Sequence, residues 1–189
     1  IEDGRAHVLA SRWGAPTIPS AVSYNLDGTV VVGRPAFERA ALHAKHTVLG
    51  SKRLVGRPFH SPIVQMVREH FAYDIVQGDL GEAALLLENE VVSLEEVSAH
   101  LLEEIRRTAE LQLDTVVNRA VVTCPAFFNE RQRESVRVAG ELAGFHVERV
   151  LSEPTAAALE YGLGQGFETR RVMVYDLGGS TFDVSLLEV

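Results

Sequence analysis

The second half of the chain alternates between short apolar runs rich in β-branched residues and segments with helical periodicity. Strands are predicted over residues 120–123, 147–151, 172–175 and 181–187, and helices over residues 130–142 and 156–161. Asn129 can cap the first of these helices, and Gly144 suits its C-terminal end. Because alternating strands and helices indicate an α/β layer, we expect a mixed sheet with helices packed on it.

The first part of the chain predicts short strands and broken helices. Residues 6–33 are interpreted as short strands, in which 18–24 and 29–32 flank the hairpin signal Asp27-Gly28. Residues 34–71 are interpreted as several short helices, because prolines interrupt the helical pattern.

A second hairpin and a long helix follow. The hairpin is predicted from residues 85–87 and 91–92, and the helix covers 94–113, where Ser93 and Glu96 form a capping box. We therefore expect two subdomains: an α/β core from residues 1–24 and 116–189, and a smaller α+β subdomain from residues 25–115.

Charge and composition exclude several classes of protein. The net charge of −8 argues against a nucleic-acid or anionic-membrane binder, and the longest apolar run, residues 83–87, is too short to span a bilayer. The first residues have neither the basic start nor the apolar stretch of a signal peptide. Cys124 is the single cysteine, so no intramolecular disulfide forms. A cytoplasmic location is expected.

The segment Tyr175–Asp183 has the composition of a phosphate-binding turn. An apolar strand runs into Asp176, and Gly178 and Gly179 let the backbone turn sharply. Backbone N–H groups in such a turn bind anions, Thr181 adds a hydroxyl, and carboxylates at both ends suit a hydrated magnesium ion. The alternative is an ordinary hairpin with glycines in its turn and aspartates as caps.

Three other segments join a strand or turn to a helix. Glu153 follows a strand and begins a helix, at the sheet edge where α/β proteins bind ligands, although it could simply complement the helix dipole. Lys52 could contact a phosphate or lie on a solvated helix face. Pro125 stiffens a turn before two phenylalanines that we expect in the core.

Cys124 is interpreted as a small buried apolar side chain. The histidines show no ligand spacing, so none is assigned to a metal.

Taken together and in this order, these segments resemble the DnaK-type heat-shock chaperones, the seventy-kilodalton heat-shock protein family. Glu153-Pro154-Thr155-Ala156-Ala157-Ala158, then Asp176-Leu177-Gly178-Gly179, with Pro125-Ala126-Phe127-Phe128-Asn129 upstream, carry the resemblance, which extends over essentially all 189 residues. It implies the first lobe of the N-terminal ATPase domain, without its first phosphate-loop strands. The implied fold is the actin-like, ribonuclease H-like one, and the implied ligands are ATP or ADP and Mg²⁺.

The resemblance also implies a role for individual residues. Lys52 matches the lysine that contacts the γ-phosphate and positions the attacking water, and Asp176 and Glu153 match catalytic carboxylates. Asp183, Glu153 and Asp176 match the residues that hold magnesium through water. The second phosphate loop corresponds to Gly178, Gly179, Ser180 and Thr181, where Ser180 replaces a glycine.

Other matched residues lie at surfaces for partners. Pro125 matches a switch that couples the nucleotide state to the peptide-binding domain, Arg133 is its arginine partner, and Arg149 lies where J-domain co-chaperones dock. Ser152 replaces an asparagine beside that surface. The expected partners of the whole protein are a J-domain co-chaperone, a nucleotide exchange factor and unfolded polypeptide.

The resemblance implies a magnesium-dependent ATPase that couples ATP turnover to binding and release of unfolded polypeptide. We expect the present chain to bind nucleotide weakly at best and not to turn it over. Without the first strands, an open sheet edge would favour self-association. Ser180 and Ser152 leave open an alternative, a non-catalytic regulatory or interaction relative on the same fold.

Overall fold

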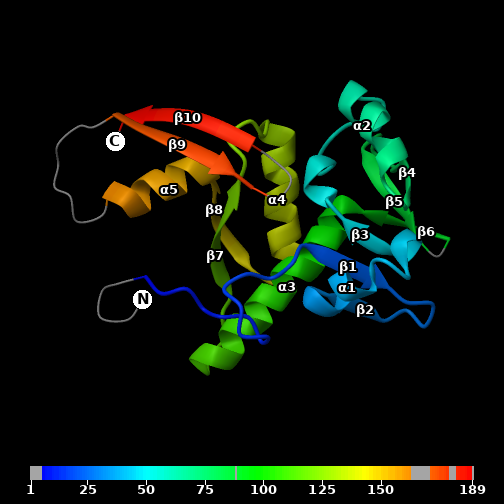
Figure 1. The fold of residues 1–189 in the computed structure, drawn as a ribbon, viewed down its shortest axis with the longest axis horizontal. Coiled ribbons are helices and arrows are strands. Elements are labelled where there is room, and N and C mark those ends of the chain that lie inside the picture. Colours follow the sequence, from blue (N-terminus) through cyan, green and yellow to red (C-terminus); the bar gives the residue numbers. More distant parts are fainter. Residues whose placement is uncertain (1–5, 88, 163–170, 179–181, 189) are drawn as a thin grey trace.

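The computed structural model describes residues 6–87, 89–162, 171–178 and 182–188, and its elements mix α and β structure (Figure 1). The strands are β1 Ala21–Tyr24, β2 Val30–Val32, β3 Thr47–Leu49, β4 Asp74–Gln77, β5 Ala83–Leu87, β6 Glu90–Ser93, β7 Arg119–Cys124, β8 His146–Ser152, β9 Arg171–Leu177 and β10 Phe182–Glu188. The helices are α1 Arg34–Arg39, α2 Pro62–Val67, α3 Leu94–Leu113, α4 Glu130–Leu142 and α5 Glu153–Gly162, with single 3-10 turns η1 Ala44–His46, η2 Ser51–Arg53 and η3 Arg68–His70.

Two three-stranded antiparallel sheets form one half of the molecule, in the orders β2-β1-β3 and β4-β5-β6. Both predicted hairpins are confirmed: β1 pairs with β2 across the Asp27-Gly28 turn, and β5 pairs with β6. Gly28 has φ +79°, a conformation that glycine adopts without strain. Since β1 also pairs with β3, the predicted subdomain boundary after residue 24 falls inside a sheet. The division into subdomains remains a prediction.

The main hydrophobic core lies in this half. Its centre is formed by fully buried side chains of β5 and α3, among them Leu85, Leu94 and Val97. Leu54, which follows η2, is also completely buried in this core. Leu54, two residues after Lys52, therefore anchors the segment that carries this lysine on the core.

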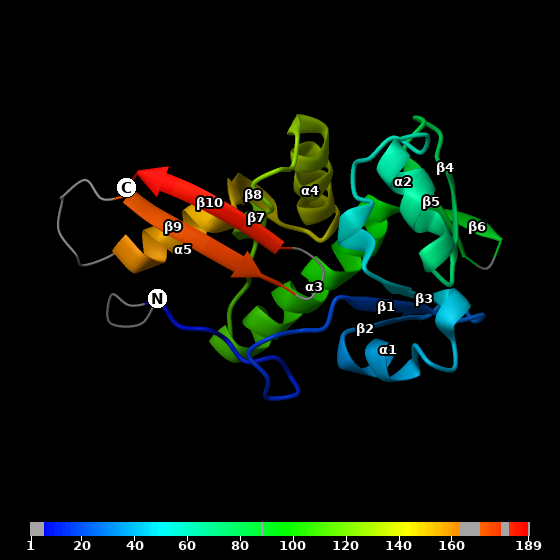
Figure 2. The same ribbon diagram turned by 45° about the horizontal axis from the view of Figure 1, so that its top comes forward.

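Helix α3 runs between the two halves of the molecule (Figures 1 and 2). Its start is the predicted capping box: the backbone N–H of Glu96 donates to Ser93 Oγ at 3.1 Å, and Ser93 N–H donates to Glu96 Oε2 at 2.8 Å. One side of α3 contacts β1, β5 and β6, and another packs along α4. A second, smaller core of Ala99, Ala143 and Phe145 lies at that junction.

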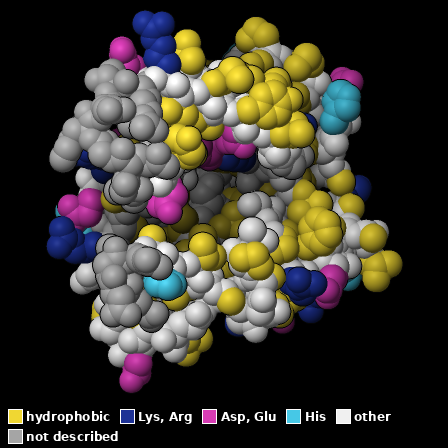
Figure 3. Space-filling view, turned by 60° about the vertical axis from the view of Figure 1, so that its left-hand side comes forward, with side chains coloured by type: hydrophobic (Ala, Val, Ile, Leu, Met, Phe, Trp, Pro, Cys, Tyr) yellow, Lys and Arg dark blue, Asp and Glu magenta, His cyan; other side chains and the backbone are white. Residues whose placement is uncertain are grey.

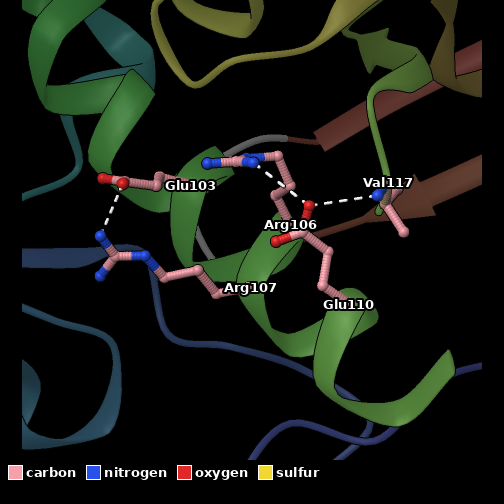
Figure 4. Close-up of polar contacts among 5 residues, drawn as sticks. All are labelled: Glu103, Arg106, Arg107, Glu110 and Val117. Atoms are coloured by element: carbon pink, nitrogen blue, oxygen red, sulfur yellow. Dashed lines mark hydrogen bonds and ion pairs between the residues drawn. The ribbon is translucent and has the colours of Figure 1, made fainter. Parts of the chain in front are cut away.

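Polar contacts near the end of α3 hold the connection into β7 (Figure 4). Glu110 Oε1 accepts a hydrogen bond from Arg106 at 3.2 Å and another from the backbone N–H of Val117 at 3.1 Å. On the neighbouring face Arg107 donates to Glu103 at 2.7 Å. One carboxylate thus joins the last turns of the helix to the chain that enters the next strand.

The other half contains α4, α5 and two separate strand pairs. Strands β7 and β8 are parallel and joined through α4, whereas β9 and β10 form an antiparallel hairpin. The described strands of this half thus form two separate pairs, where a mixed sheet was expected. Helix α5 contacts all four strands.

The N-terminal segment also differs from the prediction. Residues 6–20 contain no helix or strand, although short strands were predicted there. Pro19 lacks the N–H that a sheet requires, and β1 begins only after it. The segment instead packs on α3, where Arg12 pairs with the buried Glu104 at 3.0 Å and Gln112 donates to the carbonyl of Ala10.

Within the part of the chain that the structure describes, none of the helices has the length and apolar character needed to cross a bilayer.

Candidate functional site

Four of the predicted site residues, Lys52, Glu153, Asp176 and Gly178, line one pocket with a volume of about 610 Å³. Lys52 comes from η2, Glu153 is the first residue of α5, and Asp176 lies near the end of β9. The described residues that line it are Pro19, Ser20, Phe37, Leu49, Gly50, Ser51, Lys52, Glu153, Asp176 and Gly178. Residues far apart in the chain thus converge on one cavity.

The molecule is visibly hollowed on the side that carries the β9–β10 hairpin and the N-terminal segment. Figure 3 shows a depression near the centre of this face, and acidic and basic side chains lie next to each other at its upper edge. A concave surface with charges of both signs at its margin suits a charged ligand that is partly enclosed.

Lys52 and Glu153 form an ion pair at the pocket. Lys52 Nζ donates to Glu153 Oε1 at 2.6 Å, and the two side chains are 45% and 22% exposed. Such a partly solvated pair contributes about 1 kcal/mol or less to stability. A ligand with a negative oxygen and a bound cation can therefore replace it at low cost.

Local backbone structure places each member of this pair. Gly50 precedes η2 with φ +69°, which turns the chain so that Lys52 follows on a tight 3-10 turn. At the other side, β8 ends at Ser152 and α5 begins at Glu153 without an intervening loop, and the buried Pro154 occupies the first turn, as predicted. The acidic side chain therefore lies at the positive end of a helix.

Asp176 and Asp183 lie directly opposite each other on β9 and β10. Side chains of directly opposed residues project from the same face of a hairpin, and like charges there are destabilising. A cation that interacts with both carboxylates would remove this repulsion. Gly178 is exposed and lines the pocket, whereas Gly179, Ser180 and Thr181 lie outside the described residues.

A metal site made wholly of protein ligands is not found in the described part of the chain. No group of three or more His, Cys, Asp or Glu side chains there is placed to hold an ion. The predicted magnesium contacts through Glu153, Asp176 and Asp183 are contacts through water, so they remain a prediction.

Pro125 and Arg133 are joined through one residue of the turn that leads into α4. Pro125 is fully buried at the end of β7, its carbonyl accepts from Phe128 N–H at 3.1 Å, and Arg133 Nε donates to the Phe128 carbonyl at 3.1 Å. Both phenylalanines were expected in the core. Phe128 is buried as expected, whereas Phe127 is 49% exposed, so the expectation is wrong for Phe127. Phe127 adjoins the turn on its solvent side.

Arg149 lies on β8, apart from the pocket. It is exposed and stands opposite Val121 of β7 in the parallel pair. Its side chain is accessible to a partner, and its predicted role in docking remains a prediction.

Cys124, at the end of β7, is confirmed as a buried side chain with 1% exposure. Desolvation raises the pKa of its thiol above the ordinary value, which the nearby Arg133 only partly offsets. Since the thiolate is the nucleophile, we expect Cys124 of the folded protein to react with a disulfide reagent such as Ellman's reagent at least about 100-fold more slowly than free cysteine.

The measurement is the rate of thiol release in buffer and in denaturant. Full reactivity in denaturant with protection in buffer is the expected result, and equal rates would contradict the burial of this side chain.

The apolar wall of the pocket was not predicted. Pro19, Phe37 and Leu49 form it, but nothing in their local sequence distinguishes them from ordinary core or turn residues. Only the fold brings them beside Lys52.

Comparison with known protein families decides the relationship. The family model described as Hsp70 protein matches residues 1–189, which is the whole chain. The chain belongs to the Hsp70 family. Hsp70 proteins are chaperones with an actin-like ATPase domain that binds ATP or ADP with Mg²⁺, and they work with co-chaperones and client polypeptides. The α/β content of the structure agrees with this assignment.

Proposed function

We propose that the pocket between η2, the start of α5 and the end of β9 binds the phosphates and magnesium of ATP, in the ATP-hydrolysing domain of an Hsp70 chaperone. The observation that supports this most strongly is the convergence of Lys52, Glu153 and Asp176 on one cavity. A cation for phosphate oxygens and carboxylates for hydrated magnesium are the two donor types that this ligand requires.

Each side chain has a distinct task in this proposal. Lys52 leaves Glu153, contacts the terminal phosphate and positions the attacking water, while Asp176 accepts a hydrogen bond from water near it. Glu153 and Asp183 would hold waters of a bound Mg²⁺, and backbone N–H groups near Gly178 would bind phosphate oxygens. Bound Mg²⁺ would neutralise charge on the phosphate oxygens. Catalysis would therefore rest on positioning and charge neutralisation.

The proposal extends to the surfaces that couple this site to partners. Cys124, which directly precedes the turn from Pro125 to Arg133, is within electrostatic range of Lys52 and Glu153 at the pocket and of Arg133. We assign to this turn the coupling between nucleotide state and a peptide-binding domain. Arg149 is assigned to the docking of a J-domain co-chaperone, and a nucleotide exchange factor and unfolded polypeptide complete the proposed partners of the cytoplasmic chaperone.

Calorimetric titration with magnesium ATP tests the site. We expect saturable binding weaker than about 100 μM, which corresponds to about 5.5 kcal/mol. The variant Lys52→Ala should bind about tenfold more weakly, because it removes the positive charge from the phosphate site.

Lys45→Ala is the matched control, since Lys45 lies outside the lining of the pocket. Equal affinities of Lys52→Ala and wild type would contradict the proposed site, as would equal losses in the two variants. Steady magnesium-dependent release of phosphate by this chain would show that the expected lack of turnover is wrong.

A further inference from the structure

Gln132, in the first turn of α4, makes a long-range contact that capping does not require. Its side chain is 2% exposed, and Nε2 donates to the backbone carbonyl of Val55 at 3.1 Å, across 77 residues of sequence. The rest of the residue belongs to a capping box: its N–H donates to Asn129 Oδ1 at 3.0 Å, and its Oε1 accepts from Asn129 N–H at 3.4 Å. One side chain therefore caps a helix and holds a distant loop.

The loop and the helix are also in close steric contact. Gly56 has φ +65°, and a Cβ built on it would lie 2.7 Å from Gln132 Cα and 3.1 Å from the carbonyl oxygen of Arg131. Real Cβ atoms do not approach backbone so closely, so only glycine fits here. The backbone of the loop thus lies directly against the first turn of α4.

This loop is the continuation of the turn that carries Lys52. Leu54 and Val55, which follow η2, are 0% and 4% exposed, so the segment has little freedom to move. Lys52 Nζ, at its start, reaches Glu153 at 2.6 Å. The position of the lysine is therefore set at two points, by the contact with α4 behind it and by the carboxylate in front of it.

We propose that Gln132 is a positioning residue for Lys52: through the carbonyl of Val55 it fixes the distance between the lysine turn and α4, and with it the reach of Nζ into the pocket. This rests on the proposed function of the pocket. When Glu153 is released to magnesium, the contact with α4 and the burial of Leu54 in the core remain as anchors of the lysine turn. The same helix begins after the Pro125 turn, so a shift of α4 would be passed to the lysine.

NMR spectroscopy can report directly on the position of the Lys52 side chain, because Lys45 and Lys52 are the two lysines of the chain. Protein labelled with ¹³C,¹⁵N-lysine gives two sets of side-chain NMR signals. The Lys45→Arg variant assigns them, because only the signals of Lys52 remain in it. Lys45 is exposed and serves as an internal reference. The Cε signal of Lys52, recorded without nucleotide, reports the position of the side chain irrespective of whether ATP binds.

Two variants separate positioning from capping. Gln132→Leu removes the bond to Val55 and half of the capping box, whereas Asn129→Ala removes the cap and leaves the bond to Val55. We expect the Lys52 signal to move toward that of Lys45 in Gln132→Leu and to remain in place in Asn129→Ala. Affinity for magnesium ATP should fall roughly fivefold in Gln132→Leu alone, the loss expected for one hydrogen bond.

Gly56→Ala probes the same contact from the loop and leaves Gln132 in place, which guards against a Gln132 variant that does not fold. It should move the Lys52 signal in the same direction. An unchanged Lys52 signal in the folded variants, or equal shifts in Gln132→Leu and Asn129→Ala, would overturn the positioning role. If the signal moves as expected but the wild type does not bind ATP, the positioning holds and the proposed function fails.

Discussion

Replacing Leu85 with alanine should lower the free energy of unfolding by about 3 kcal/mol. Leu85 is completely buried in β5, between Ile75 of β4 and Val92 of β6, at the centre of the main core. Truncation removes apolar contacts and leaves a cavity among β-branched neighbours, which have few rotamers with which to fill it. Urea unfolding followed by circular dichroism measures the loss.

Leu86 provides the matched control on the same strand. Its side chain points to the opposite face of the sheet and is 38% exposed, so Leu86→Ala should cost less than about 1 kcal/mol. The melting temperature should fall by about 2–4 °C for each kcal/mol of unfolding free energy lost in a domain of this size, so it should fall further in Leu85→Ala than in Leu86→Ala. Equal losses in the two variants would contradict an orientation of β5 with Leu85 facing the core and Leu86 facing away from it.

Gly140→Ala should destabilise the protein by about 2 kcal/mol, although glycine to alanine within a helix is ordinarily stabilising by about 0.5–1 kcal/mol. Gly140 lies in α4 where the helix packs on the β7–β8 pair. A Cβ at this position would lie 2.4 Å from Cγ2 of Val147 in β8. Because valine is stiff about its first side-chain torsion, it cannot turn away without moving a strand or helix.

A double-mutant cycle with Val147→Ala isolates this contact. In the Val147→Ala background the methyl group is gone, so Gly140→Ala should become neutral or stabilising, and the coupling energy should be about 2 kcal/mol. Thermal and urea unfolding of the four proteins give the cycle. Additive effects would mean that the two positions are not in contact.

Local signals predicted the long helices well. The capping boxes at Ser93 and Asn129 set the first residues of α3 and α4, and Gly144, with φ +87°, follows the end of α4 as predicted. These signals lie within a few residues of the helix end, so no tertiary information is needed to interpret them.

Strands β3 and β4 were not predicted, for a physical reason. Thr47–Leu49 has three residues, too few to show alternation, and becomes a strand by pairing with β1. Asp74–Gln77 likewise depends on β5. Strand formation rests on partners elsewhere in the chain, which a local pattern does not contain.

The site was predicted in a similarly uneven way. Residue types at the junctions suggested phosphate and magnesium, but the roles of Lys52 and Glu153 came from family resemblance. Their ion pair joins residues 101 positions apart, and no spacing rule links such positions. The contact between Gln132 and Val55 was missed for the same reason, since in the sequence Gln132 is only the third residue of a helix.

The docking of residues 6–20 on α3 has a consequence for the order in which the chain folds. The unit β7-α4-β8 closes over a short stretch of sequence, whereas the contact of Gln112 with Ala10 closes a loop of 102 residues. Long loops form late because their ends must first be brought together at an entropic cost. The N-terminal segment is thus expected to dock last on a preformed helix and, having no ladder of backbone hydrogen bonds, to be the first to detach when the native state opens locally.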